Sequence, residues 1–169
     1  MKLLLICHAI AEEREDFAKT GKDDRLRPLT DEGRKKMKQA AKGLRKIVPE
    51  IDLLATSPLT RAAQTGAILD SVYGGLKVAE IKELSPETTP EAFLRWLRKH
   101  QKKEVVAAVG HEPGLGQILG WLLTGTDRRL FAFRKGGACL LDFPDDEPAG
   151  GTATLLWALT PAQLRTLAD

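Results

Sequence analysis

The sequence has few cysteines, few aromatic residues and almost no excess of charge of one sign. Two cysteines in 169 residues make no disulfide framework. Aromatic residues make up 5% of the chain and the formal net charge is only +3. A dedicated nucleic-acid surface would show a stripe of basic residues interleaved with aromatic ones. We therefore expect neither a disulfide-rich scaffold nor a protein with a nucleic-acid partner.

Long apolar runs are also absent. No stretch approaches the roughly 18 apolar residues that a membrane span requires. The run "LLLI" (3–6) is too short for the core of a signal peptide, and no small-residue cleavage site follows it. We therefore expect a cytoplasmic protein with no membrane partner.

The usual signatures of metal and nucleotide sites are missing as well. The stretch "GHEPGLG" (110–116) lacks the G-K-[ST] of a phosphate-binding P-loop, and no H-E-x-x-H occurs. Cys7 and Cys139 lie in separate apolar runs and form no zinc-ligand set. No carboxylate-rich group suggests another ion, so we expect no cofactor and no metal.

What the chain does contain is an alternation of strand and helix signals. Its hydrophobic content of 43% and charged content of 29% are typical of a soluble globular protein, and 169 residues suffice for one well-packed core. We expect residues 1–169 to form a single domain. Apolar, strand-like runs occur at 2–7, 51–56, 76–81, 104–110, 137–143 and 152–159.

Helix-start signals follow the first, second, third and last of these runs, and a helix from about Pro113 to Thr124 is expected after the fourth. Thr30 predicts an N-cap, and Ser57-Pro58, Thr89-Pro90 and Thr160-Pro161 predict further helix starts with proline at the first position. The polar stretch 12–28 has no sustained period and predicts a loop. The alternation predicts a three-layer α/β/α sandwich around a mainly parallel sheet of about six strands. The last two strands, with no helix between them, predict an antiparallel edge.

Unusual polar residues follow four of the expected strands. His8 follows the first strand, and Ser57 and Arg61 follow the second. Glu83 follows the third and His111 the fourth. Ligand sites of parallel sheets lie beyond the carboxyl ends of the strands, so these residues should meet at one edge. Arginine binds phosphoryl oxygens and imidazole can attack phosphorus, so the set favours phosphoryl transfer.

Taken singly, these residues also have purely structural interpretations. His8 could be a satisfied histidine at a strand end, Glu83 a loop cap and His111 a helix cap. Arg61 could be an ordinary surface residue of its helix. The shared edge of the sheet is what favours the functional interpretation.

Five blocks carry a family resemblance, in order along nearly the whole chain. They are "LLLICHAIAE" (3–12), "RPLTDEG" (27–33), "SPLTRAAQT" (57–65), "ELSP" (83–86) and "VGHEPGLG" (109–116). In these blocks the chain resembles the histidine phosphatase superfamily, which includes the phosphoglycerate mutases, and within it the small SixA-type phosphohistidine phosphatases. The resemblance implies a phosphoglycerate mutase-like fold and a hydrolase that uses no metal.

The resemblance also implies roles for individual residues. His8 would be the nucleophile that becomes transiently phosphorylated, and His111 the second imidazole of the pocket. Arg61 would bind phosphate, with Ser57 beside it. Glu83 occupies the position of an acid that protonates the leaving group in many members. The implied substrate is phosphohistidine in a signalling or phosphotransfer protein, or a small phosphomonoester.

Cys7 departs from the family pattern. The family has arginine at this phosphate-binding position, and cysteine supplies no such charge. Losing one preorganised donor typically costs on the order of a hundred- to a thousand-fold in rate. A cation from the loop after the first strand could compensate, and the candidates are Lys19, Lys22, Arg25 and Arg27.

Three interpretations therefore stay open. The first is a slowed or compensated phosphatase based on His8. The second is a degenerate member that binds phosphorylated ligands as a regulatory module. The third is a phosphatase with Cys7 as nucleophile, which the spacing disfavours because Arg14 lies one position too far for a C-x5-R loop. The plain alternative for Cys7 is a small apolar residue that ends a buried strand.

The basic segment "TDRRLFAFRKGG" (126–137) precedes the fifth expected strand. We interpret it as a solvated loop, and part of a docking rim for a protein substrate is the alternative. Neither interpretation gives this segment a part in the chemistry.

Overall fold

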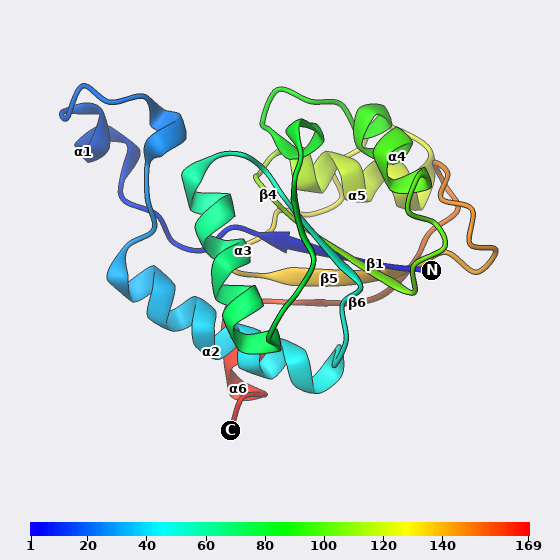
Figure 1. Ribbon diagram of the computed structural model, residues 1–169. Helices are drawn as coiled ribbons and strands as arrows, with labels where there is room; N and C mark the ends of the chain where they lie inside the picture. The colour runs from blue at the N-terminus through cyan, green and yellow to red at the C-terminus, as the bar shows by residue number, and fades with distance from the viewer.

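A six-stranded sheet lies between two layers of helices in the computed structural model, which describes residues 1–169 (Figure 1). The strands are β1 (Lys2–Cys7), β2 (Leu53–Thr56), β3 (Val78–Glu80), β4 (Val105–Gly110), β5 (Ala138–Asp142) and β6 (Thr154–Leu159). The helices are α1 (Arg14–Ala18), α2 (Asp31–Ile47), α3 (Thr60–Tyr73), α4 (Pro90–Arg98), α5 (Gly114–Thr124) and α6 (Pro161–Thr166). This confirms the predicted α/β sandwich.

The order of the strands is β3-β2-β4-β1-β5-β6. The four strands from β3 to β1 are parallel, and Cys7 at the end of β1 lies opposite Gly110 at the end of β4. β5 runs antiparallel to β1, with Ala138 opposite Ile6, and β6 runs antiparallel to β5. The predicted antiparallel edge is confirmed. The start of β5 therefore lies at the same edge of the sheet as the carboxyl end of β1.

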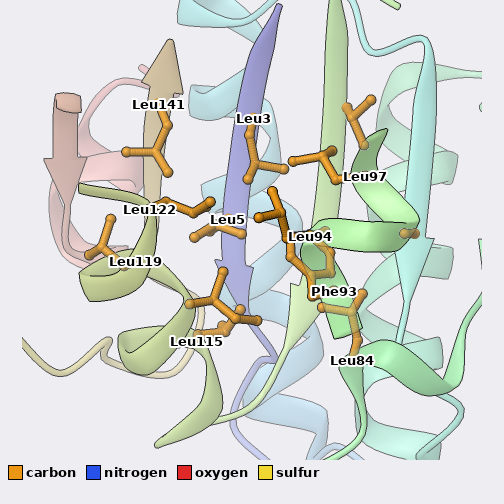
Figure 2. Close-up of a cluster of buried hydrophobic side chains, with 14 of the residues drawn as sticks. Leu3, Leu5, Leu84, Phe93, Leu94, Leu97, Leu115, Leu119, Leu122 and Leu141 are labelled. Carbon is orange, nitrogen blue, oxygen red and sulfur yellow. The ribbon is translucent and has the colours of Figure 1, made fainter. Parts of the chain in front are cut away.

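One face of the sheet packs against α4 and α5 (Figures 1 and 2). Side chains alternate along a strand, so Leu3, Leu5 and Cys7 of β1 enter this core. Phe93 of α4 and Leu115 of α5 meet them from the helix layer and are almost completely buried. The apolar run of β1 is continuous because this central strand is buried on both faces.

The other face packs against α2, α3 and α6. Thr30 caps α2 as expected, since its hydroxyl accepts a hydrogen bond from the Gly33 N–H at 2.9 Å. Gly43 of α2 allows the close approach of α6, because a Cβ there would lie 1.8 Å from the Leu164 carbonyl oxygen. One helix of each layer begins directly after a central strand, α3 after β2 and α5 after β4. No helix of the structure is both long and apolar enough to cross a membrane.

Two local expectations are wrong. α3 begins at Thr60 with Leu59 in the N-cap position and no side-chain cap, so Ser57 is not the N-cap. Its hydroxyl is instead bonded to another segment of the chain, described below. The stretch 12–28 is not all loop, because it forms α1 and a short 3₁₀ turn at Asp24–Leu26.

Candidate active site

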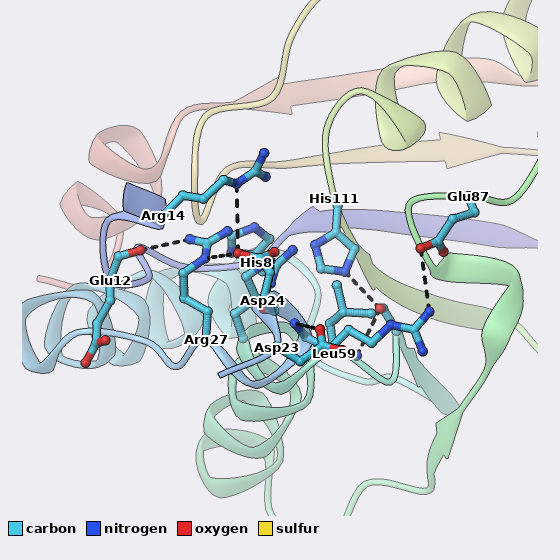
Figure 3. A network of polar contacts seen from close by, with 12 residues as sticks. His8, Glu12, Arg14, Asp23, Asp24, Arg27, Leu59, Glu87 and His111 are labelled. Atoms are coloured by element: carbon cyan, nitrogen blue, oxygen red, sulfur yellow. Dashed lines mark hydrogen bonds and ion pairs between the residues drawn. The ribbon is translucent and has the colours of Figure 1, made fainter. Parts of the chain in front are cut away.

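Four buried polar side chains lie at the carboxyl edge of the parallel strands, and Figure 3 shows two of them, His8 and His111. His8 follows β1, Ser57 follows β2, Arg61 lies in the first turn of α3 and His111 follows β4. Their exposed fractions are 2%, 0%, 3% and 5%. Buried polar groups of this kind are uncommon unless they are bonded or functional. The structure thus brings together four of the residues that the sequence singled out.

His8 is held as a neutral imidazole with one defined lone pair. Its Nδ1 lies 2.7 Å from the Ala9 carbonyl oxygen, which can only accept, so Nδ1 carries the proton. Nε2 is then unprotonated and faces the Lys135 Nζ at 3.2 Å. Burial, followed by the charges of Lys135 and His111, lowers the pKa of His8 from 6.5 to about 2. The nitrogen lone pair is therefore available at neutral pH.

His111 lies beside His8, with 5.0 Å between the ring centroids. Its Nε2 is 2.8 Å from the Ser57 Oγ, which also accepts a hydrogen bond from the Leu59 N–H at 3.3 Å. When the hydroxyl donates to Nε2, the proton of the ring sits on Nδ1, and this buried atom has no partner. Burial and then the charge of Arg61 lower the pKa of His111 to about 3. This imidazole is neutral, and in the tautomer that accepts from Ser57 it offers one free N–H.

The guanidinium of Arg61 has hydrogen-bond partners for only some of its N–H groups. Its guanidinium donates to the Asp24 carbonyl oxygen at 3.0 Å and lies 3.4 Å from the Asp24 carboxylate. The Nε of Arg61 is buried and has no hydrogen-bond partner. Arg27 donates to the same Asp24 carboxylate at 2.8 Å, and this bond is the main reason that the pKa of Asp24 is lowered. Figure 3 shows Asp24 between Arg14 and Arg27. One carboxylate is thus shared among several guanidiniums.

The free donors are the chemically informative feature of this cluster. Arg61 Nε and His111 Nδ1 are both buried N–H groups without an acceptor, and an unsatisfied buried donor is costly. The surrounding charge is positive, since the arginines outnumber Asp24. An anion with several oxygens would satisfy both donors, and a phosphoryl group is such an anion.

The backbone around the cluster is held by side-chain hydrogen bonds. Thr65 Oγ1 accepts from the Ala9 N–H at 3.0 Å and donates to the Arg61 carbonyl oxygen at 2.7 Å. This completely buried threonine therefore joins the segment after His8 to the first turns of α3. Such bonds fix functional side chains before a ligand arrives.

Cys7 does not fit its predicted place among the phosphate-binding residues. Its side chain is completely buried and packs in the apolar core with Leu5 and Leu115. Burial raises the pKa of the Cys7 thiol to about 11, so the thiolate needed for a nucleophile does not form at neutral pH. The alternation of side chains along β1 explains this, because it directs Cys7 into the core between the sheet and α5.

Glu83 is not brought into contact with the two imidazoles. It lies in the 3₁₀ turn Lys82–Leu84 and lines a cavity of about 820 Å³ together with Arg95. Its carboxylate forms no hydrogen bond or ion pair, and only its backbone oxygen is bonded, to the Thr88 hydroxyl at 2.7 Å. A role as general acid stays a prediction.

Of the cations suggested to replace the missing arginine, Arg27 is joined to the cluster through a shared partner. It is buried and shares Asp24 with Arg61. Lys19 pairs with Asp16 at 3.0 Å, on the exposed surface of α1. Arg25 reaches Glu87 at 3.8 Å, also on the surface.

Two residues of the cluster were missed in the sequence. Asp24 lies in a stretch that carries no pattern. Lys135 lies in the basic segment 126–137, which we interpreted as solvated. Lys135 becomes predictable only once β5 is known to lie beside β1, because an antiparallel strand there begins at the edge where β1 ends.

Comparison with known proteins agrees with this geometry. The sequence pattern of the histidine phosphatase superfamily (branch 1) matches residues 3–85. An uncharacterised protein of Picosynechococcus sp. is 34% identical over 139 residues, which cover 81% of this chain and 82% of that protein. Phosphohistidine phosphatase SixA of Escherichia coli (strain K12) is 27% identical over 157 residues, which cover 89% and 91%.

A solved structure of the protein histidine phosphatase SixA, complexed with tungstate, has the same fold. It superposes with a TM-score of 0.82 at 21% identity and covers 97% of this chain and 99% of that one. The chain belongs to the histidine phosphatase superfamily, in its SixA-type branch. This membership confirms the phosphoglycerate mutase-like fold and supports phosphatase activity.

Proposed function

We propose that the chain is a metal-independent phosphatase that carries the phosphoryl group on His8 and removes it from phosphohistidine in a signalling or phosphotransfer protein. One observation carries the proposal. The unprotonated His8 Nε2 belongs to a buried, positively charged cluster in which Arg61 Nε and His111 Nδ1 have no hydrogen-bond partner. A nucleophile and unfilled oxygen-binding donors are the two parts that phosphoryl transfer requires.

In the first step, His8 Nε2 attacks the phosphorus of the substrate. A bond forms between Nε2 and phosphorus, and the bond between phosphorus and the leaving imidazole nitrogen breaks. The leaving nitrogen keeps the electron pair, and the ring departs as neutral imidazole because its other nitrogen carries a proton. The phosphoryl oxygens meanwhile accept hydrogen bonds from Arg61 and His111.

In the second step, water attacks the phosphorus of phosphorylated His8. The bond between phosphorus and Nε2 breaks, the electron pair returns to the ring, and inorganic phosphate leaves with the elements of water. The Nδ1 proton remains bonded to the Ala9 carbonyl oxygen throughout, so the ring keeps its orientation.

Two observations support phosphohistidine on a protein as the substrate. The similar protein from Escherichia coli carries the name phosphohistidine phosphatase. Arg61 also lines an open cavity of about 570 Å³, and a neighbouring cavity of about 820 Å³ shares Arg25 and Glu87 with it. This broad approach suits a phosphorylated side chain that is presented on a protein surface.

Glu83 has a small part in this scheme. The conjugate acid of a leaving imidazole has a pKa near 6.5, so departure from phosphorus needs little proton donation. A small phosphomonoester would leave as an alkoxide and would depend more strongly on an acid.

The proposal is tested by covalent labelling with a ³²P-phosphohistidine protein. Wild type should form an acid-labile phosphoenzyme and release phosphate. His8→Ala should form no label and lose at least about 10⁴-fold in turnover, because the nucleophile is gone. His100→Ala is the matched control, since this histidine lies at the end of α4 against Trp96 and should keep turnover within about twofold.

Two outcomes would overturn the proposal. An acid-stable label that is lost in Cys7→Ser would assign the chemistry to the cysteine. Binding of the phosphoprotein by wild type without any turnover would make the chain a phospho-ligand binding or regulatory module.

A further inference from the structure

The hydrogen-bond partner of the attacking atom of His8 is a lysine from the turn that precedes β5. Lys135 Nζ lies 3.2 Å from His8 Nε2, although the two residues are separated by 127 positions. We infer that Lys135 binds the phosphoryl group during transfer and replaces the charge that the family pattern places at the position of Cys7. This inference rests on the proposed function, because it assigns the cation for that same step.

Backbone hydrogen bonds fix the residues directly after Lys135 against the carboxyl end of β1. The Gly136 N–H lies 3.1 Å from both the Cys7 and the His8 carbonyl oxygens, and the Cys7 N–H donates to the Gly137 carbonyl oxygen at 3.0 Å. Gly136 has a φ of +82°, a conformation that other residues rarely adopt. These bonds hold the chain beside His8 directly after Lys135, so the position of the lysine does not depend on a loose loop.

The side chain itself is exposed and is free to move with the reaction. In the unliganded protein, the ammonium donates to the lone pair of Nε2. When Nε2 forms its bond to phosphorus, that lone pair is used, and the nearest acceptors become the phosphoryl oxygens. The flexible four-carbon stem of lysine lets the ammonium follow them without a change in the backbone.

The distribution of ion pairs around His8 also supports a phosphoryl-binding role for Lys135. Arg61 and Arg27 both share the carboxylate of Asp24. Lys135 forms no ion pair, and its only hydrogen-bond partner is His8. A full positive charge thus faces the nucleophile without a carboxylate to neutralise it. An incoming phosphoryl group supplies the negative charge that this arrangement lacks.

This assignment explains how a chain with cysteine before the nucleophile can still act as an enzyme. Cys7 is directed into the apolar core and leaves no charge at the end of β1. β5 lies antiparallel to β1 and begins beside it, so the residues that precede β5 reach the same pocket. The positive charge that is missing at Cys7, at the end of β1, is therefore supplied by Lys135, which precedes the neighbouring strand β5.

Three variants test the inference. Lys135→Met removes the charge and keeps most of the stem, and Lys135→Arg keeps the charge. Arg134→Met is the matched control, since Arg134 is the adjacent exposed cation and has no contact with His8. The first measurement is the Kd of each protein for tungstate by calorimetry. The second is the single-turnover rate of phosphoenzyme formation from the ³²P-phosphohistidine protein.

We expect Lys135→Met to slow phosphoenzyme formation about 10²- to 10³-fold and to weaken tungstate binding at least about tenfold, as removal of a transition-state donor does. Lys135→Arg should retain binding within about tenfold, and Arg134→Met should match wild type. A Lys135→Met protein that binds tungstate and forms phosphoenzyme like wild type would overturn the inference.

Failure of the inference and failure of the proposed function give different results. If wild type forms label on His8 and Lys135→Met is unaffected, the proposed function stands and the role of Lys135 is wrong. If His8→Ala turns over normally, the proposed function is wrong. In that case, unchanged tungstate affinity in Lys135→Met would also remove Lys135 from the anion site.

Discussion

Cys7 and His8 are neighbours in the chain but lie in regions with opposite properties. Cys7 belongs to a core of 21 buried apolar residues between the sheet and the α4–α5 layer. His8 belongs to a cluster of buried polar groups that includes two N–H donors without acceptors. Packing in the core stabilises the fold, whereas each unsatisfied donor costs about 1–3 kcal/mol. Stability and activity should therefore respond to different substitutions.

The largest effect is expected in the core. Phe93 of α4 is completely buried, so Phe93→Ala should lower the free energy of unfolding by about 3–5 kcal/mol. The kcat/KM of the folded fraction should not change. Urea denaturation and kinetics below the unfolding midpoint measure the two quantities separately. A lower kcat/KM at unchanged stability would show that the two regions are not independent.

Arg61→Met is expected to lower activity strongly and stability only slightly, the reverse of Phe93→Ala. Loss of a phosphate-binding donor should lower kcat/KM about 10²- to 10³-fold, or about 2.7–4 kcal/mol of transition-state stabilisation. The unfolding free energy should change less than in Phe93→Ala, because Arg61 loses only its contacts with Asp24, while its Nε has no partner to lose. Arg45→Met is the control, since Arg45 is an exposed arginine of α2 bonded to the Val72 carbonyl oxygen. Equal kinetic losses in both variants would contradict the assignment.

Cys7→Ser tests the boundary between the two regions. A hydroxyl in place of the thiol is buried among apolar side chains and should cost about 1–3 kcal/mol in stability. Turnover should stay within about twofold, and Cys139→Ser should behave in the same way, because Cys139 is an equally buried thiol of β5. Turnover that disappears while stability is kept would place the thiol in the reaction.

Lowering the pH should lower the free energy of unfolding, because the two buried histidines of the site resist protonation. The pKa values of His8 and His111 are about 2 and 3, below their ordinary 6.5, so the unfolded chain binds protons that the native protein does not. Their contribution to stability is complete above pH 6.5 and is lost as the pH falls toward these values. Each histidine should cost about 1 kcal/mol between pH 6.5 and 5.5. Denaturation curves of wild type and His111→Gln at both pH values measure this, and identical pH dependence would refute it.

The smallest effect is expected for Glu83→Gln. Its carboxylate contacts neither imidazole, and an imidazole leaving group needs little acid. Turnover of a phosphohistidine protein should therefore fall by less than about threefold, as measured by phosphate release. A loss of about a hundredfold or more is what general acid catalysis would produce, and it would bring Glu83 back into the mechanism.

The rule for parallel sheets explains which site residues the sequence could predict. His8, Ser57 and His111 follow β1, β2 and β4, so chain order alone predicts that they lie at one edge of the sheet, and they meet because these three strands are adjacent. Glu83 follows β3, the edge strand, which is separated from β1 by two other strands. Lys135 required the knowledge that β5 lies beside β1, and no local pattern reveals which strands are neighbours.

The structure confirms the predicted helices and strands where a capping residue or a continuous apolar run marks them in the sequence. Thr30, Thr89 and Thr160 all cap their helices, because their hydroxyls satisfy free N–H groups of the first turn. Ser57 has the same local signature but bonds His111 instead. A tertiary hydrogen bond there replaces the local one, and only the assembled fold discloses it.

The central place of β1 also bears on how the protein folds. Lys2 of β1 pairs with Val105 on one side and Asp142 on the other, so both neighbours of this strand come from the second half of the chain. Such long-range pairing makes folding slow and leaves strand edges exposed until it is complete. His8 and Lys135 meet only when the last strands have docked, so under the proposed function phosphoenzyme formation would report the completed fold. A partly folded chain would hold no phosphate, however intact its first half.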